Sequence, residues 1–211
     1  MEIDLTYKIA IIGDCRVGKT SIIHRSVYGD YSDKYIKTLA VGYCSKVFRM
    51  DNKNIKLNIW DLSGEYSYRT VVKAYLRHVH GIIFVYDVTN RESFKNIEDW
   101  LKLVNEIENK KTTKLLLANK IDKINNRNVG VDDGVKYAMK NNMIYLDVSA
   151  KNCNLMNFLK IFTEFIMDTN EEKTLFENTK LCNKENNNKY FVNENTLKTL
   201  NDVESCDCNI S

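Results

Sequence analysis

The sequence predicts a doubly wound α/β sandwich, in which helices cover both faces of a mainly parallel sheet. Short β-rich apolar runs alternate with helical patterns, some runs are almost continuously apolar, and one turn-rich segment lies between strand-like runs. Because parallel strands need right-handed crossovers, alternating helices and strands return the chain to one sheet. The 211 residues, 44% hydrophobic and 28% charged, suffice for one substantial core but not for two large domains.

The expected strands are runs rich in Ile, Val, Leu, Phe and Tyr. They span residues 7–12, 57–60, 82–87, 114–118 and 143–148. The first, third and fourth are nearly continuous, which is typical of strands buried on both faces. Residues 50–54 read Met-Asp-Asn-Lys-Asn between two strand-like runs, and they predict a single antiparallel hairpin.

Two later segments carry apolar residues at every third or fourth position, which predicts amphipathic helices. The two stripes are Phe94, Ile97, Trp100, Leu101, Val104, Ile107 and then Leu155, Phe158, Leu159, Phe162, Phe165, Ile166. Thr89 and Glu92 have the spacing of a capping box, so we expect the first of these helices to begin there.

The composition changes near residue 170. Residues 170–211 contain five Lys, no Arg and eight Asp or Glu, a net charge of −3, whereas the whole chain carries +3. The segment also lacks sustained apolar periodicity, which is typical of mobile chain. We therefore expect a folded domain over residues 1–169 and a flexible tail over residues 170–211.

Charge and composition argue against several classes of protein. A net charge of +3 without a basic stripe does not indicate a nucleic-acid-binding protein. No run approaches the ~18 apolar residues of a membrane-spanning helix, and the first residues do not resemble a signal peptide. Apart from the last two, the six cysteines have no regular spacing, so we expect reduced thiols.

A phosphate-binding motif, G-x-x-x-x-G-K-[ST], lies between an apolar strand and a helical pattern. Its residues are Gly13, Asp14, Cys15, Arg16, Val17, Gly18, Lys19 and Thr20, followed by Ser21. Glycines let backbone N–H groups surround an oligophosphate, and the helix N-terminus adds partial positive charge. Lys19 offers charge to the β- and γ-phosphates, and Thr20 a hydroxyl to Mg²⁺. Alone, the motif indicates a nucleoside triphosphate site or a Gly-rich turn of an unrelated α/β protein.

A second motif selects the base. Asn119, Lys120 and Asp122 follow an apolar run, at the carboxyl end where open sheets bind ligands. The Asp122 carboxylate can accept two parallel hydrogen bonds from guanine N1–H and its exocyclic amine, whereas adenine would leave that charge unpaired. Ser149, Ala150 and Lys151 follow the next strand and can close the other side of the base. Together these residues predict guanine.

With these motifs the chain resembles the small GTPases of the Ras superfamily, and most closely the Rab branch. Residues 56–64, KLNIWDLSG, are similar to the Rab pattern K-L-Q-I-W-D-T-A-G, and residues 85–89, VYDVT, are similar to V-Y-D-I-T. The resemblance covers about residues 7–168. It implies a six-stranded P-loop NTPase sheet with one antiparallel hairpin strand, binding of GTP or GDP with Mg²⁺, and two mobile switch segments.

The resemblance also implies roles for individual residues. Tyr31 lies where an aromatic ring stacks on guanine, and Thr38 where a threonine meets Mg²⁺ and the γ-phosphate. Asp61 is the carboxylate behind the Mg²⁺ ligands, and the Gly64 amide contacts the γ-phosphate. The implied metal set is thus Thr20, Thr38 and Asp61. Tyr43, Trp60 and Tyr75 match an aromatic triad that faces effectors in Rab proteins.

Glu65 stands where the family has a catalytic glutamine, which orients the attacking water in Ras. A glutamate can accept a proton but cannot donate an amide hydrogen bond, and at ~6 Å from a phosphate charge the repulsion is about 2.8 kcal/mol for an effective dielectric of ~20. We expect slow intrinsic GTP hydrolysis, with Lys19, Thr38 and Glu65 as the catalytic candidates. The alternative is a scaffold that binds nucleotide with little or no hydrolysis.

Three further departures concern residues near the motifs. Arg16 is bulky where relatives have a small residue. It can approach the phosphates or an acidic switch residue, but we favour a solvated side chain. Ala40 and Gly42 replace the Gly and Asp of the family pattern T-I-G-V-D-F, which changes the expected partners more than nucleotide binding.

The last residues, Cys206-Asp207-Cys208-Asn209-Ile210-Ser211, have two interpretations besides unmodified thiols. They contain the C-x-C pair of doubly prenylated Rab proteins and also a formal C-a-a-X signal. Two lipids anchor a protein more firmly than one, and the acidic residues nearby offer no electrostatic help. Lipidation at Cys206, Cys208 or both is expected.

The resulting hypothesis is a monomeric Rab-like switch in vesicle traffic. It would cycle between cytosol and the cytoplasmic face of an intracellular membrane. Its expected partners are an exchange factor, an activating protein, effectors and prenyl-carrier proteins. A metabolic P-loop enzyme such as a nucleotide kinase is a weaker alternative, because the N-K-I-D and C-x-C motifs would have no purpose there.

Overall fold

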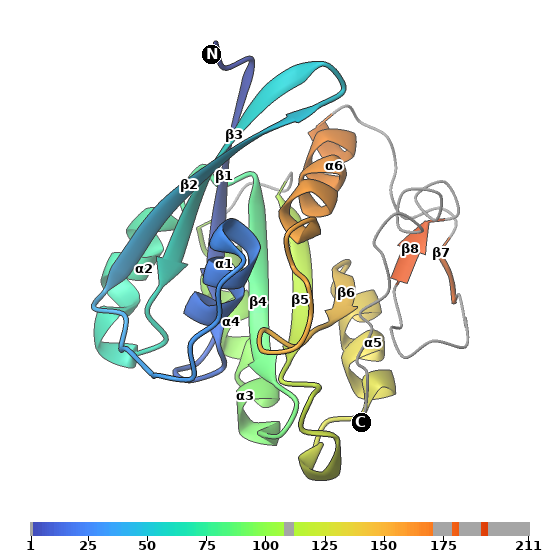
Figure 1. Ribbon diagram of the computed structural model, residues 1–211. Coiled ribbons are helices and arrows are strands. Elements are labelled where there is room, and N and C mark those ends of the chain that lie inside the picture. Colours follow the sequence, from blue (N-terminus) through green and yellow to red (C-terminus); the bar gives the residue numbers. More distant parts are fainter. Residues whose placement is uncertain (1, 108–111, 171–178, 182–190, 194–211) are drawn as a thin grey trace.

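A six-stranded sheet with strand order β2-β3-β1-β4-β5-β6 forms the centre of the computed structural model, which describes residues 2–107, 112–170, 179–181 and 191–193 (Figure 1). The strands are β1 (Leu5–Ile12), β2 (Val41–Met50), β3 (Lys53–Leu62), β4 (Gly81–Asp87), β5 (Thr113–Asn119) and β6 (Ile144–Asp147). All neighbours pair in parallel except β2, which is antiparallel to β3. The expected mostly parallel sheet with one antiparallel hairpin is confirmed.

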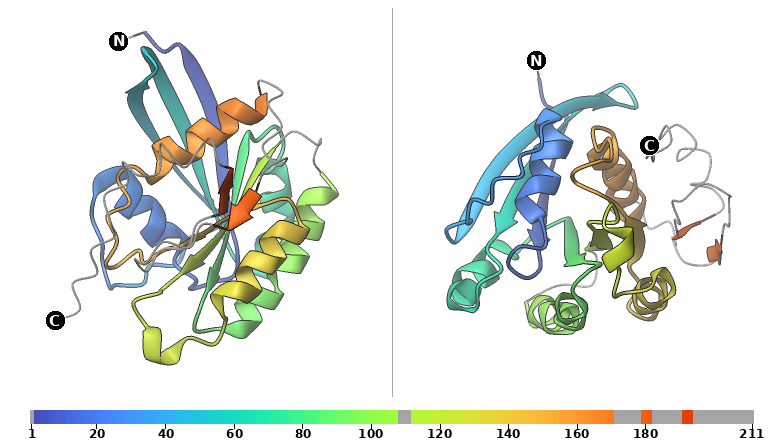
Figure 2. Two further views of the ribbon diagram at one scale, coloured as in Figure 1. Left: turned by 90° about the vertical axis from the view of Figure 1, so that its right-hand side faces the viewer. Right: turned by 60° about the horizontal axis from the view of Figure 1, so that its bottom comes forward.

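Helices cover both faces of this sheet. They are α1 (Lys19–Tyr28), α2 (Arg69–Tyr75), α3 (Arg91–Lys95), α4 (Ile97–Asn105), α5 (Val131–Lys140) and α6 (Phe158–Asn170), with 3-10 turns η1 (Tyr66–Tyr68) and η2 (Ile124–Asn126). The buried side chains of α1 and α6 join one core cluster, and those of α2, α4 and α5 join the other. The right-hand view of Figure 2 shows the two groups of helices on opposite faces. Every residue of β4 is buried between them.

The β2–β3 hairpin turns at Asp51 and Asn52. Both have positive φ angles, 48° and 61°, and Met50 pairs with Lys53. Two left-handed residues form the turn whose twist matches that of the strands, and Asp and Asn tolerate this conformation better than other side chains. The sequence prediction of a hairpin here is confirmed, although the strands are longer than their apolar runs.

The predicted start of the helix near residue 90 is wrong by one residue. Asn90, not Thr89, is the N-cap, and its side-chain oxygen accepts hydrogen bonds from the backbone N–H groups of Glu92 and Ser93. The Thr89 hydroxyl instead donates to Asp87 Oδ1 at 2.7 Å, because the carboxylate at the end of β4 lies within reach.

The amphipathic stripe over residues 94–107 is divided between two helices. α3 ends at Lys95 and α4 begins at Ile97, with Asn96 between them. Ile97, Trp100 and Val104 are buried as the stripe predicts. The second stripe also contributes to the core, although Leu155 lies before α6 begins.

Part of the chain beyond residue 170 is described. β7 (Thr179–Leu181) and β8 (Phe191–Asn193) form an antiparallel pair separate from the main sheet. Cys206 and Cys208 lie outside the described residues. Within the segments listed above, no helix is both long and apolar enough to cross a membrane.

The parallel strands end at one edge of the sheet, the lower edge in Figure 1. β1 ends at Ile12, β4 at Asp87, β5 at Asn119 and β6 at Asp147. The polar residues that follow these strands therefore meet at one edge, which is where open α/β sheets bind ligands.

Candidate functional site

The loop of residues 13–20 connects β1 to α1 and has an unusual backbone. Gly13, Arg16 and Gly18 have φ angles of 140°, 65° and 98°. A Cβ atom on Gly13 would lie 2.2 Å from the carbonyl oxygen of Val85, and one on Gly18 would lie 2.3 Å from the Asn119 side chain. Glycine is therefore required at both positions, because any larger residue would displace the loop.

Lys19 is almost fully buried inside this loop. Its Nζ donates hydrogen bonds to the carbonyl oxygens of Gly13 at 2.9 Å and Asp14 at 2.8 Å. Burial lowers the pKa of the Lys19 ammonium, while the nearby Asp61 carboxylate opposes that shift. A buried cation with part of its hydrogen-bonding capacity directed to the loop is suited to hold an oligophosphate.

Three oxygen-bearing side chains meet beside Lys19. Thr20 Oγ1 donates to Asp61 Oδ2 at 2.5 Å, Thr38 Oγ1 lies 3.2 Å from the same oxygen, and the two hydroxyl oxygens are 3.0 Å apart. Burial raises the pKa of Asp61, while the hydrogen bond from Thr20 and the charge of Lys19 oppose this. The resemblance grouped these three residues, and the structure brings them together.

This cluster fits a magnesium ion. Asp61 Oδ1 is buried and has no hydrogen-bond partner among the described residues, which leaves a carboxylate oxygen beside two hydroxyl groups. Hard oxygen ligands of this kind are the ones Mg²⁺ prefers, together with water and phosphate oxygens. The same part of the chain has no cluster of three or more His, Cys, Asp or Glu side chains that could hold a metal.

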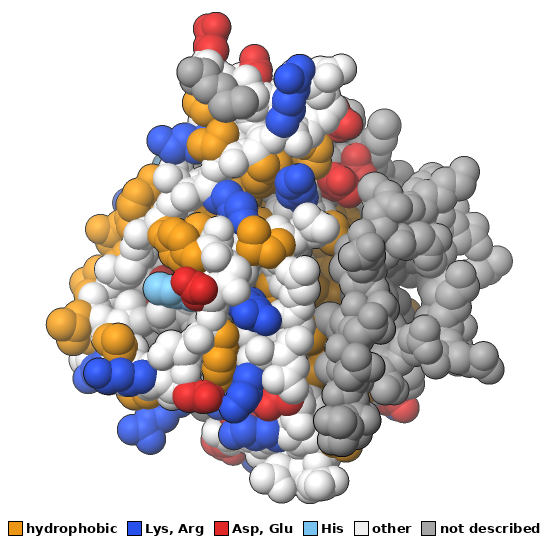
Figure 3. Space-filling model, viewed as in Figure 1, with side chains coloured by type: hydrophobic (Ala, Val, Ile, Leu, Met, Phe, Trp, Pro, Cys, Tyr) orange, Lys and Arg blue, Asp and Glu red, His pale blue; other side chains and the backbone are white. Residues whose placement is uncertain are grey.

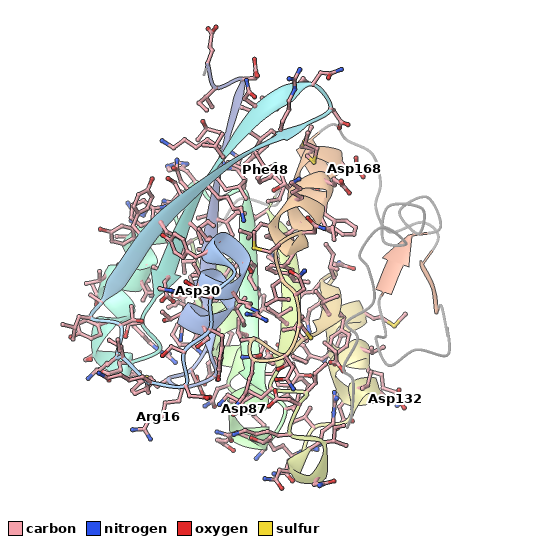
Figure 4. All side chains as sticks on the ribbon, in the orientation of Figure 1. Arg16, Asp30, Phe48, Asp87, Asp132 and Asp168 are labelled. Atoms are coloured by element: carbon pink, nitrogen blue, oxygen red, sulfur yellow. The ribbon has the colours of Figure 1, made fainter. Side chains whose placement is uncertain are left out.

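A cavity of about 530 Å³ lies over the loop. Ten residues named from the sequence line it: Cys15, Arg16, Gly18, Lys19, Thr20, Ser21, Tyr31, Thr38, Gly64 and Lys120. Sequence reasoning missed other lining residues, among them His24, Asp30, Tyr35, Ile36 and Lys37. Most of these lie between Tyr31 and Thr38, so the spacing of those two residues already pointed to the segment. Figure 4 labels two of the lining residues, Arg16 at the lower edge of the molecule and Asp30 above it beside α1.

Asn119 and Lys120 join the base-side motif to the phosphate loop. Asn119 donates to the carbonyl of Val17 at 2.8 Å and accepts from the backbone N–H of Ala150 at 3.1 Å. Lys120 Nζ donates to the carbonyl of Arg16 at 2.7 Å and forms a 2.6 Å ion pair with Asp87. These contacts fix the ends of β4, β5 and β6 against the loop.

Asp122 is hydrogen-bonded to the segment that follows β6. Ser149 Oγ donates to Asp122 Oδ1 at 2.6 Å, which holds the carboxylate in place. Lys151 forms a 3.3 Å ion pair with Asp33, and the Tyr31 hydroxyl donates to the same carboxylate at 3.1 Å. Burial raises the pKa of Tyr31.

Eight residues named from the sequence lie near the cavity without lining it: Gly13, Asp14, Val17, Asp61, Asn119, Asp122, Ser149 and Ala150. Lys151 is a ninth. Four of the nine contact lining residues directly, since the Gly13 and Asp14 carbonyls accept from Lys19, Asp61 accepts from Thr20, and Lys151 pairs with Asp33. Asp122, Ser149 and Ala150 belong to the base-side group next to the cavity.

Asp14 anchors the loop to the neighbouring helices. Its carboxylate accepts hydrogen bonds from Asn96 Nδ2 at 2.7 Å and from Trp100 Nε1 at 2.9 Å. Asn96, which lies between α3 and α4 and interrupts the amphipathic stripe, thus holds the phosphate loop in place. Neither partner was predicted, because their distance along the sequence hides the contact.

Arg16 is exposed, as expected, but it is not fully solvated. Its guanidinium carbon lies 5.3 Å from the centroid of the Tyr35 ring. An aromatic partner was not among the expected ones. The contact links the phosphate loop to the segment that carries Thr38.

Glu65 forms an ion pair with Lys37. Its Oε1 lies 2.6 Å from Lys37 Nζ, and the hydrogen bond to Glu65 raises the pKa of Lys37. Lys37 lines the cavity, whereas Glu65 does not. The neighbouring Gly64 approaches the phosphate loop so closely that a Cβ would lie 2.3 Å from the carbonyl carbon of Asp14.

The three aromatic residues that the resemblance grouped, Tyr43, Trp60 and Tyr75, lie in contact with one another in sequence order. The ring centroids of Tyr43 and Trp60 are 4.7 Å apart, and those of Trp60 and Tyr75 are 4.8 Å apart. Exposed apolar side chains nearby include Ile36, Leu39, Tyr43, Tyr66 and Val71. Figure 3 shows hydrophobic side chains along the edge formed by β2 and α2.

Comparisons with known proteins agree with this site. The model of the Ras family matches residues 8–171. Ras-related protein Rab-1 of Theileria annulata is 42% identical over 163 residues, 77% of this chain and 73% of that protein. GTP-binding protein YPTM2 of Zea mays is 38% identical over 151 residues, 72% of this chain and 74% of that protein. Ras-related protein RABD1 of Arabidopsis thaliana has the same identity and coverage.

Proposed function

The chain belongs to the Ras family of small GTPases, and on this premise we propose that it is a Rab-type switch in vesicle traffic, controlled by GTP and GDP. One observation carries the proposal. The Lys19 loop, the Thr20–Thr38–Asp61 cluster and the Asp122–Ser149 pair all lie at the carboxyl edge of one sheet.

In this proposal the phosphate end of the nucleotide binds over residues 13–20. The Lys19 ammonium and the backbone N–H groups of the loop neutralise the phosphates. Thr20 and Thr38 would hold Mg²⁺ with their hydroxyl oxygens, and Asp61 would accept hydrogen bonds from both hydroxyl groups. When bound, Mg²⁺ supplies positive charge that stabilises the phosphate oxygens.

Guanine is selected beside this cavity, at the Asp122–Ser149 pair. Ser149 already holds one oxygen of Asp122, so the carboxylate is oriented before a base arrives. Asn119 fixes the two motifs to each other, and Tyr31 provides the aromatic ring beside the base. Adenine would leave the Asp122 charge without its donors, a loss of several kcal/mol.

Hydrolysis adds water to the γ-phosphorus and breaks its bond to the β–γ bridging oxygen. Glu65 can accept a proton from this water but has no amide hydrogen to donate. Its pairing with Lys37 offsets part of the charge that would repel the phosphates. We expect intrinsic hydrolysis that is slow, with Lys19 and Thr38 stabilising the transferring group.

Calorimetry tests nucleotide binding. The full chain in Mg²⁺ buffer should bind GDP and GTP, but ATP at least 100-fold more weakly, because a mismatched base costs several kcal/mol. An Asp122→Ala variant should lose the preference for guanine. No heat with GDP, or tighter binding of ATP, would refute the proposal.

Phosphate release in a single turnover tests hydrolysis. Glu65→Gln should release phosphate faster than the wild type, because it restores an amide donor at this position. Equal rates would contradict the expectation of slow intrinsic hydrolysis. No release from the wild type, even with an activating protein, would favour the scaffold that binds nucleotide without turnover.

The chain beyond the folded domain completes the proposal. Residues 170–211 would serve as a tether, and prenyl groups on Cys206 and Cys208 would attach it to the cytoplasmic face of an intracellular membrane. Regulators, effectors and prenyl-carrier proteins would be its partners. Intact-mass spectrometry of protein purified from a eukaryotic host should show the added lipid mass, and an unmodified mass would refute the anchor.

A further inference from the structure

Lys37 and Glu65 form an ion pair between two segments that are far apart in the sequence. Glu65 takes the position at which the family carries glutamine, and Lys37 immediately precedes Thr38. Their charged atoms are 2.6 Å apart, and the two side chains are 48% and 29% exposed. The pair is therefore close and partly shielded from solvent.

The ion pair joins the same two segments as other contacts do. Ser63 donates its backbone N–H to the carbonyl of Ala40 at 2.9 Å, and Thr38 Oγ1 lies 3.2 Å from Asp61 Oδ2. The backbone of Glu65 is itself fixed, because its carbonyl accepts from the N–H of Tyr68 at 3.1 Å. The Glu65 side chain therefore extends from a backbone that this hydrogen bond holds in place.

We propose that the Lys37–Glu65 ion pair is a clasp that ties residues 34–40 to residues 63–68 and slows the escape of the bound nucleotide. Lys37 is a positioning residue, because its ammonium holds the Glu65 carboxylate and thereby the segment that carries Glu65. Lys37 lines the cavity and Glu65 does not, so the ion pair ties Glu65 to a side chain of the cavity wall and partly neutralises its carboxylate. This inference rests on the proposed binding of guanine nucleotide.

The size of the effect follows from the exposure of the pair. Ion pairs that remain partly in solvent change an equilibrium constant by about twofold to fivefold. A clasp that favours the closed arrangement should slow release by the same factor, since nucleotide leaves from the open one. Salt at 1 M shortens the screening length to about 3 Å and should remove much of the difference.

The test follows release of a fluorescent, non-hydrolysable GTP analogue from the full chain. Lys37→Met and Glu65→Gln should each release it about twofold to fivefold faster than the wild type. The double variant should be no faster than either single variant, because both remove one interaction. Lys37→Arg should stay close to the wild type.

A matched control uses the ion pair between Lys73 and Glu106. That pair has a similar length, 2.7 Å, and lies on α2 and the end of α4. Lys73→Met should leave the release rate unchanged. Single variants at the wild-type rate, or a double variant that multiplies their effects, would overturn the clasp.

A second measurement needs no nucleotide. A double-mutant cycle of Lys37→Met and Glu65→Gln in urea unfolding should show a coupling of about twofold to fivefold, and an absent coupling would overturn the ion pair itself. If the wild type binds no guanine nucleotide, both the proposed function and the slowing of nucleotide release by the clasp are refuted. That outcome does not depend on whether this cycle detects coupling between Lys37 and Glu65.

Discussion

Gly64→Ala should push residues 63–65 away from the phosphate loop. The new Cβ would lie 2.3 Å from the carbonyl carbon of Asp14, 2.4 Å from the nitrogen of Cys15 and 2.6 Å from the oxygen of Gly13. All three are backbone atoms, so no side chain can rotate away. Ordinary contact begins near 3.4 Å, which requires a shift of about 1 Å.

The cost of this overlap is about 1–3 kcal/mol, as for other overpacked sites. The protein can lose that stability, or residues 63–65 can move outward and weaken binding of the triphosphate by about 5- to 150-fold. Urea unfolding and calorimetry with GDP and a non-hydrolysable GTP analogue measure the two outcomes. The losses in the free energy of unfolding and in the free energy of binding should together amount to about 1–3 kcal/mol. The affinity for GDP should fall less than the affinity for the GTP analogue.

Gly130→Ala is the matched control. Its nearest neighbour beyond the adjacent residues is Asp133 Oδ2 at 3.9 Å, and its φ of −64° suits alanine. This variant should stay within about 1 kcal/mol of the wild type, because alanine restricts the unfolded chain but is disfavoured at the N-cap of α5. The reasoning fails if Gly64→Ala behaves like Gly130→Ala in both measurements.

Arg16→Ala removes the cation over the Tyr35 ring while keeping a side chain on left-handed backbone, so urea unfolding should show a loss of about 0.5–1 kcal/mol. Unchanged stability would count against the stacking. Cys15 is exposed and lines the cavity, so peptide mapping after iodoacetamide should find it alkylated in nucleotide-free protein and protected by GDP. Equal labelling would place the nucleotide elsewhere. Tyr145→Phe deletes a hydroxyl that donates to the buried Asp147 carboxylate, and urea unfolding should show a loss of about 1–3 kcal/mol. A variant as stable as the wild type would contradict this.

The central strands could be predicted from the sequence because their burial is simple. β4 is covered on both faces along its whole length, so its apolar run is nearly continuous. β2 lies at an edge of the sheet and alternates between partly buried and exposed residues, so it gave only a hairpin signal at its turn. The ends of β3 were underestimated because ladder pairing continues through polar residues such as Lys53, whereas β6 is shorter than its predicted run of residues 143–148.

The motif residues could be located in advance because their spacing is local. The loop of residues 13–20 needs glycine at positions 13 and 18, where a Cβ atom would clash, and both glycines are visible in the sequence. The partners of Asp14, Arg16 and Glu65 could not be found in this way. Each partner comes from a distant part of the chain, and only the fold brings the side chains together.

Trp100 gives the molecule an optical probe of its own. The chain has two tryptophans, and Trp100 is buried with its indole N–H on the Asp14 carboxylate, one residue into the phosphate loop. With Trp60→Phe, the tryptophan emission, excited at a wavelength too long for the tyrosines to absorb, would come from Trp100 alone. Its wavelength and quenching would then register loop rearrangements in real time, without any attached dye.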